Sequence, residues 1–145
     1  MKNLAVFCSG KPGIKEEYIE VTKQLMKSLD NTKIKVAYGG GNVGLMGVVR
    51  EAFIENGGTV ISSNVHRFVV PGIPDDYLFE NITDRQAKLV ELGDMFLLLP
   101  GGYGSIYEIL QVIVMNQIGE SSKDIIIFNY NGVYDFFIKQ IEVLE

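Results

Sequence analysis

Short apolar segments alternate with helical segments along the whole chain, and glycine or proline follows several of the apolar ones. The apolar segments are continuous rather than alternating, as in MFLLL at 95–99, which is typical of parallel strands covered on both faces. Repeated strand–helix units predict an α/β fold, a Rossmann-like doubly wound parallel sheet in three layers. We expect one domain, residues 1–145, with strands at 4–8, 34–38, 59–63, 78–81, 95–99 and 124–128, and helices at 16–29, 45–56, 84–93, 105–118 and 133–144.

Composition narrows the possible functions. Hydrophobic residues make up 47% and charged residues 21%, which excludes a disordered chain. The 13 basic and 18 acidic side chains give a net charge of −5, which argues against nucleic-acid binding. No apolar run approaches the length of a membrane span, and the single cysteine indicates a reducing compartment, so we expect a cytoplasmic protein. With one histidine and one cysteine, we expect no metal site.

The first glycine-rich loop, YGGGNVGLMG at 38–47, follows the second expected strand. Gly39, Gly41 and Gly44 match the G-x-G-x-x-G pattern of dinucleotide-binding loops. Such a site also needs an acidic residue about 20 positions later, and that neighbourhood, 62–64, reads Ser-Ser-Asn. We therefore favour a loop whose backbone N–H groups face a phosphate or ribose, with a tight packing turn as the alternative.

The second glycine-rich loop, PGGYGSIYE at 100–108, follows the most apolar strand. Its glycines allow close backbone approach, and the helix that follows offers free N–H groups and a positive dipole end, which suit an anion such as phosphate. Ser105 adds a hydroxyl donor. The spacing of Ser105 and Glu108 equally matches a capping box, in which Glu108 bonds back to the Ser105 N–H. Both interpretations remain open from the spacing.

Taken together, the two loops resemble the GGGxxGLMG and PGGxGTxxE motifs of the Lonely Guy (LOG) family, and the similarity extends over essentially the whole chain. Members are often labelled lysine decarboxylases, although this short chain has no evident lysine for a Schiff base. The resemblance implies a homodimeric Rossmann-like hydrolase without a cofactor. It would cleave the N-glycosidic bond of nucleoside 5′-monophosphates, such as AMP or cytokinin riboside monophosphates, to free base and ribose 5-phosphate. The alternative is a non-catalytic nucleotide- or phosphate-binding module on the same fold.

The resemblance also implies roles for individual residues. The catalytic pair would be Arg85 and Glu108. Gln86 stands where the family has lysine, and Ser105 where it has threonine. The residues expected to bind the substrate or its phosphate are Gly39, Gly40, Gly41, Gly44, Met46, Gly101, Gly102, Tyr103, Gly104 and Ser105.

Chemistry constrains these roles further. N-glycoside hydrolysis passes through a positively charged, oxocarbenium-like sugar, which Glu108 can stabilise while also accepting a proton from water. Arg85 stays charged at neutral pH and so cannot donate a proton; we assign it to the phosphate or to orienting Glu108. We expect Asp84 to cap a helix, His66 to be a solvated loop residue and Cys8 to be a small core residue.

The helix expected at 105–118 is apolar all round its axis. A helix of this kind must be buried on more than one side, yet in a domain of this size one side would face water. We therefore predict a homodimer built partly on this helix, with a two-fold contact as the simplest arrangement.

Overall fold

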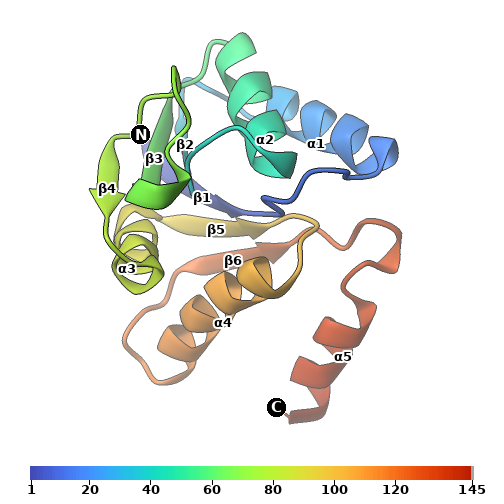
Figure 1. Ribbon diagram of the computed structural model, residues 1–145. Coiled ribbons are helices and arrows are strands. Elements are labelled where there is room, and N and C mark those ends of the chain that lie inside the picture. Colours follow the sequence, from blue (N-terminus) through green and yellow to red (C-terminus); the bar gives the residue numbers. More distant parts are fainter. Residues whose placement is uncertain (145) are drawn as a thin grey trace.

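The computed structural model describes residues 1–144 and contains one parallel six-stranded sheet between two layers of helices (Figure 1). The strand order is β4-β3-β2-β1-β5-β6, and every pair is parallel. The expected fold class is therefore confirmed. The strands are β1 (Lys2–Phe7), β2 (Ile34–Tyr38), β3 (Val60–Val65), β4 (Tyr77–Phe79), β5 (Met95–Leu98) and β6 (Asp124–Ile127). The helices are α1 (Glu16–Ser28), α2 (Gly44–Glu55), α3 (Ile82–Leu92), α4 (Tyr103–Gln117) and α5 (Asp135–Leu144), with short 3₁₀ turns at His66–Phe68 and Tyr130–Gly132.

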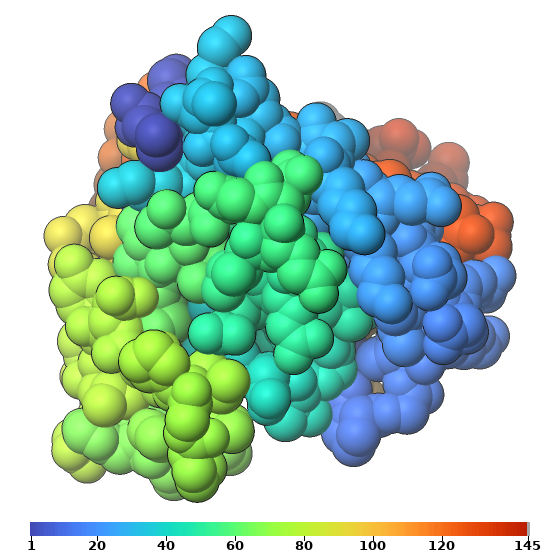
Figure 2. Space-filling view, turned by 90° about the horizontal axis from the view of Figure 1, so that it is seen from above, coloured from blue at the N-terminus to red at the C-terminus, as the bar shows by residue number. Residues whose placement is uncertain are grey.

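The central strands are continuously apolar because each of their faces lies under helices. In β1, Leu4 and Val6 join the core beneath α1 and α2, while Ala5 and Phe7 join the core on the side of α3 and α4. Figure 1 shows α1 and α2 on one face of the sheet and α3, α4 and α5 on the other. The space-filling view in Figure 2 looks onto the first face, where residues 66–75 (yellow-green) lie beside the start of α2 (teal). Alternate side chains of one strand therefore build two separate cores.

The order of the strands in the sheet determines where a ligand can bind. From β1 the chain builds outward through β2, β3 and β4, then crosses the sheet to add β5 and β6 on the other side of β1. The direction of winding thus reverses between β1 and β5, and the loops leaving their carboxyl ends diverge (Figure 1). A crevice at this position is the usual ligand site of doubly wound sheets.

Several element boundaries differ from those expected. Strand β3 continues to Val65, two residues beyond its expected end, through Asn64, which the sequence places in a loop. Helix α3 begins at Ile82, and its cap is Asn81, whose side chain accepts a hydrogen bond from the Asp84 N–H at 2.9 Å. The expectation that Asp84 caps this helix is wrong, because the helix starts two residues earlier and Asp84 lies in its first turn. Across residues 1–144, no helix is long and apolar enough to cross a membrane.

Candidate functional site

Two adjoining cavities lie at the carboxyl edge of the sheet. The first, called here the loop cavity, has a volume of about 380 Å³ and lies between the residues that follow β1 and the start of α4. The second, called the inner cavity, has a volume of about 260 Å³ and lies over the residues that follow β2. The two cavities share four lining residues, namely Gly10, Met46, Phe68 and Arg85. The two glycine-rich loops therefore meet at one depression in the switch-point crevice.

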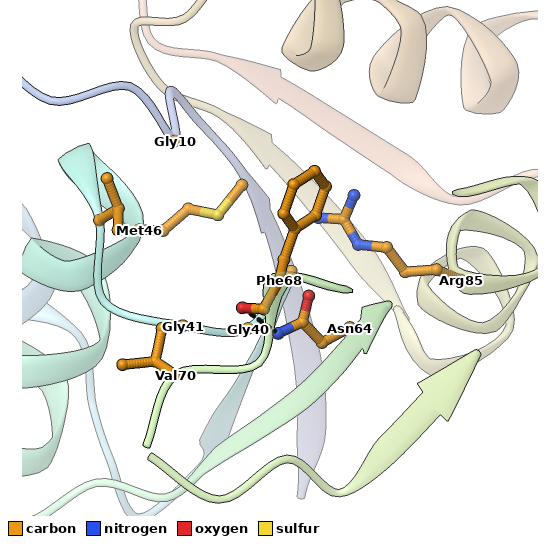
Figure 3. Close-up of a pocket in the computed structure, with 10 residues that line it drawn as sticks. Gly10, Gly40, Gly41, Met46, Asn64, Phe68, Val70 and Arg85 are labelled. Carbon is orange, nitrogen blue, oxygen red and sulfur yellow. Dashed lines mark hydrogen bonds between the residues drawn. The ribbon is translucent and has the colours of Figure 1, made fainter. Parts of the chain in front are cut away.

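The inner cavity is mainly apolar. Its floor is formed by Gly39, Gly40 and Gly41, and its walls include the side chains of Met46 and Phe68. Figure 3 shows the Met46 thioether and the Arg85 guanidinium approaching Phe68 from opposite sides. Val43, Asn64 and Val70 complete the lining. An apolar slot of this kind, edged by one cation, suits a flat heteroaromatic group.

Asn64 fixes the segment that carries Phe68. Its side-chain amide donates to the Phe68 carbonyl at 3.3 Å (Figure 3). The amide also donates to the Asp75 carboxylate at 3.3 Å, and its side-chain oxygen accepts from the Val65 N–H at 2.8 Å. Gly40 is required beneath this arrangement, because a Cβ there would lie 2.7 Å from atoms of both Asn64 and Asp75. The glycine run thus serves to bring the 66–75 segment close above the end of β2.

The start of α4 offers an open anion site. The backbone N–H groups of Tyr103, Gly104 and Ser105 have no acceptor within residues 1–144, because the first helical bond runs from the Ile106 N–H to the Gly102 carbonyl. A Cβ at Gly102 or Gly104 would meet nothing within 4 Å, so both glycines face open space. Free N–H groups and the positive end of the helix dipole make this the electropositive end of the loop cavity.

The start of α2 differs, because it is already occupied by the protein. The Ser9 carbonyl accepts from the Leu45 and Met46 N–H groups at 2.9 and 3.3 Å. Gly44 allows this contact: its φ is +64°, and a Cβ would lie 2.5 Å from the Lys11 carbonyl oxygen. A pyrophosphate could not take these N–H groups, so the geometry argues against dinucleotide binding at the first loop. Gly44 lines neither cavity, in contrast to Gly39, Gly40, Gly41 and Met46.

Arg85 is a buried side chain that borders both cavities. Its Nε donates to the Ser63 carbonyl at 3.1 Å, and the Ser63 hydroxyl donates to the Arg85 carbonyl at 3.2 Å, so α3 and β3 are tied together at this residue. A Cβ at Gly39 would overlap the guanidinium, so glycine is needed there for Arg85 to reach the cavities. Arg85 therefore lies in the interior rather than on the surface of its helix.

Glu108 faces Arg85 across the loop cavity. One carboxylate oxygen lies 3.8 Å from an Arg85 terminal nitrogen, and the Glu108 side chain is only 7% exposed. Burial raises the pKa of Glu108 from 4.5 to about 7, although the nearby Arg85 charge lowers it. The capping-box interpretation is wrong: α4 begins at Tyr103, two residues before Ser105, and its cap residue, Gly102, makes no side-chain cap. A carboxylate with this pKa can accept and release a proton near neutral pH.

Gln86 points away from both cavities. It is fully buried, and its Nε2 donates to the Glu108 backbone carbonyl at 3.1 Å, while its Oε1 has no hydrogen-bond partner among residues 1–144. Arg85 and Gln86, adjacent in α3, therefore contact the carboxylate and the main chain of the same glutamate. The residue at the position of the family's lysine therefore lines neither cavity in this chain.

The other candidate residues divide into those near the cavities and those away from them. Cys8 is buried at the floor of the loop cavity, and burial raises the pKa of its thiol well above the ordinary range, as suits a core residue. Tyr103 lies at the cavity mouth but is 94% exposed. His66 is exposed, lies 3.4 Å from Glu80 and lines neither cavity, as expected of a solvated residue.

Sequence reasoning missed several lining residues. Phe68 and Val70 belong to FVV at 68–70, an apolar run in an expected loop, and that run was the available signal. Lys11 lines the loop cavity from the turn after β1 and adds a second cation to it. Its position after a strand end was a weaker signal, because many surface turns contain lysine.

Comparison with known proteins gives a consistent result. The family model described as "possible lysine decarboxylase" matches residues 46–145. Over 97% of its length the chain is 31% identical to a cytokinin riboside 5′-monophosphate phosphoribohydrolase of Rhodococcoides fascians, covering 74% of that protein. It is 33% identical, again over 97%, to the protein of that name LOG2 from Arabidopsis thaliana, covering 68% of it. A probable enzyme of the same name from Oryza sativa is 32% identical, with 64% of its length covered.

Solved structures share the fold. The crystal structure of TM1055 superposes with a TM-score of 0.66 at 24% identity, over 80% of this chain and 71% of that one. A molybdenum cofactor carrier protein of Chlamydomonas reinhardtii gives 0.70 at 15% identity, over 98% and 85% of the two chains. At these identities the likeness concerns the fold alone. The sequence matches and the paired loop motifs lead to one assignment: the chain belongs to the LOG family, that of the cytokinin riboside 5′-monophosphate phosphoribohydrolases.

Proposed function

We propose that this protein hydrolyses the N-glycosidic bond of nucleoside 5′-monophosphates, including cytokinin riboside monophosphates. The observation that carries the proposal is the buried Arg85–Glu108 pair, which lies between an open helix N-terminus and an apolar cavity. A nucleoside monophosphate has the matching order of parts: a dianionic phosphate, a ribose and a flat base.

The phosphate fits the start of α4. Three free backbone N–H groups converge there, Ser105 adds a hydroxyl, and Lys11 adds a positive charge at the cavity edge. The base fits the inner cavity, against Met46 and Phe68. That cavity is smaller than the roughly 300–1,000 Å³ typical of sites that enclose a whole ligand, which suits one part of a nucleotide. The ribose would then lie between the two cavities, beside Arg85 and Glu108.

The chemistry follows from the charges placed around the ribose. As the C1′–N bond lengthens, its electron pair leaves with the base and positive charge develops on the sugar. The Glu108 carboxylate stabilises that charge and accepts a proton from the attacking water, whose oxygen bonds to C1′. The base takes up one proton, so water is divided between ribose 5-phosphate and the free base. Arg85 holds the carboxylate in place and, being permanently charged, donates hydrogen bonds rather than a proton.

Incubation with AMP and with a cytokinin riboside 5′-monophosphate, followed by chromatography for free base and ribose 5-phosphate, tests the proposal. Adenosine serves as the matched substrate control, because it lacks only the phosphate. We expect release of base from both nucleotides and little from adenosine. Binding of both nucleotides without release of base would instead identify a non-catalytic binding module.

We also propose a cytoplasmic homodimer. On α4, Ser105, Glu108, Ile109 and Val112 face the protein interior, while an exposed stripe runs along the opposite side. The stripe consists of Tyr107, Leu110, Val114 and Ile118, spaced three or four residues apart. A contact between two such stripes would remove a continuous apolar surface from water. The buried state of Cys8 is compatible with a reducing compartment.

A further inference from the structure

A tyrosine far along the chain from both glycine-rich loops contacts the anion-binding loop directly. Tyr134, immediately before α5, is 2% exposed. Its hydroxyl donates to the Leu99 carbonyl at 2.5 Å. Leu99 directly precedes Pro100, at the point where β5 turns into the loop. The phenol thus satisfies a backbone carbonyl at the base of the loop.

The position of Tyr134 is itself fixed by a tight corner. The Asn129 side-chain oxygen accepts from the Tyr134 N–H at 2.7 Å, and the Asn129 amide donates to the Asp135 carboxylate at 2.7 Å. The Tyr134 ring packs edge-on against Phe137, with ring centroids 6.1 Å apart. Backbone and ring are thus both held, so the hydroxyl has little freedom to follow a moving loop.

Two further contacts hold the same loop. From the other side, the Pro100 carbonyl accepts from the Ser9 N–H at 3.0 Å. Ser105 packs over Gly101 so closely that any Cβ there would overlap it. The loop is therefore held at three points, and Tyr134 provides the one that comes from the C-terminal part of the chain.

We propose that Tyr134 is a positioning residue for the phosphate subsite: it holds the 100–105 loop in the conformation that presents the N–H groups of α4 to the anion. The inference rests on the proposed function only in that a sugar phosphate binds this loop. Tyr134 lines neither cavity, and its effect passes through the backbone of Leu99.

Tyr134→Phe tests the inference, because it keeps the ring and its contact with Phe137 and removes only the hydroxyl. The Leu99 carbonyl then loses this partner, and we expect binding of ribose 5-phosphate, measured by calorimetry, to weaken about tenfold. KM for AMP should rise by a similar factor, while kcat changes little. Tyr18→Phe is the control: it removes the hydroxyl of a tyrosine on α1 that lines neither cavity, so it should leave ribose 5-phosphate affinity unchanged.

Ribose 5-phosphate affinity unchanged in Tyr134→Phe would overturn the inference, as would equal weakening in Tyr18→Phe or a wild-type protein that binds no ribose 5-phosphate. If wild type binds ribose 5-phosphate but releases no base from AMP, the proposed function fails while the affinity comparison still decides the role of Tyr134. Should Tyr134→Phe not fold, Asn129→Ala, which keeps the phenol and frees only its corner, is expected to weaken ribose 5-phosphate binding in the same direction.

Discussion

Replacing Glu108 by glutamine should change how the stability of the protein depends on pH. Burial raises the pKa of this carboxyl from 4.5 to about 7. Below about pH 4 the group is neutral in the folded and the unfolded protein, so it imposes no penalty on folding. As pH rises, the unfolded chain loses this proton first, and the folded state is destabilised until Glu108 also ionises near pH 7. Glutamine cannot ionise, so the variant lacks this penalty.

The size of this stability penalty follows from the difference between the pKa of Glu108 in the unfolded and folded protein. A difference of 4.5 against about 7 corresponds to roughly 3 kcal/mol of lost stability above neutral pH. Of this, about 2 kcal/mol should develop between about pH 5.5 and 8.5, a range above the isoelectric point in which both proteins can be compared. The charge interaction with Arg85 is already included in this shift, because it is one of the two effects that set the pKa of Glu108.

Urea unfolding of wild type and Glu108→Gln across this pH range measures the effect. We expect the stability of the variant relative to wild type to rise by about 2 kcal/mol over the range. Glu51→Gln, an exposed glutamate of α2, is the matched control and should follow wild type. If the difference between Glu108→Gln and wild type stays constant with pH, Glu108 has no raised pKa and the electrostatic argument fails.

The same substitution tests the chemistry. If ionised Glu108 takes a proton from water, kcat/KM for AMP should rise with pH to a plateau, with an inflection near 7. Glutamine should remove that inflection and lower the rate at least a hundredfold, which corresponds to about 3 kcal/mol of transition-state stabilisation. Turnover that survives in Glu108→Gln would make the glutamate structural, and a rate that falls as pH rises through 7 would make it an acid instead of a base.

Three further substitutions probe the surroundings of the pair. Gly39→Ala places a methyl group against the Arg85 guanidinium, so kcat/KM for AMP should fall at least tenfold with the circular dichroism spectrum unchanged; normal turnover would show that Arg85 need not reach the cavities. Gln86→Leu removes the bond to the Glu108 carbonyl, so kcat should fall with KM unchanged, whereas a raised KM would indicate a direct substrate contact. Val114→Glu in the exposed stripe should convert a sedimenting dimer into a monomer, and wild type sedimenting at 16.1 kDa would refute the dimer.

The fold could be predicted from the sequence because its strongest signal is local. Continuous apolar strands and helical spacing define the elements, and parallel pairing with right-handed crossovers leaves few ways to assemble them. Strand β3 was predicted too short for a physical reason. The first residue beyond its expected end at Ser63 is Asn64, which is polar because its side chain holds the 66–75 segment. Polar residues that serve tertiary contacts look like loop residues in a single sequence.

The candidate site, like the fold, could be predicted where it depends on local sequence patterns and not where it depends on tertiary contacts. By sequence, two glycine-rich loops follow strands and precede helices, and each could hold a phosphate. The structure separates them through one carbonyl group, that of Ser9, which occupies the N–H groups at the start of α2 and leaves those of α4 free. Ser9 is about 35 residues from that helix along the chain, so no local pattern could reveal the contact. Gly44 is therefore required for packing, because its Cβ would meet backbone, while Gly102 and Gly104 border open space where a ligand can approach the helix. Glycine-rich motifs of similar appearance thus support different functions. The difference depends on whether a neighbouring backbone carbonyl already accepts hydrogen bonds from the free N–H groups at the start of the helix.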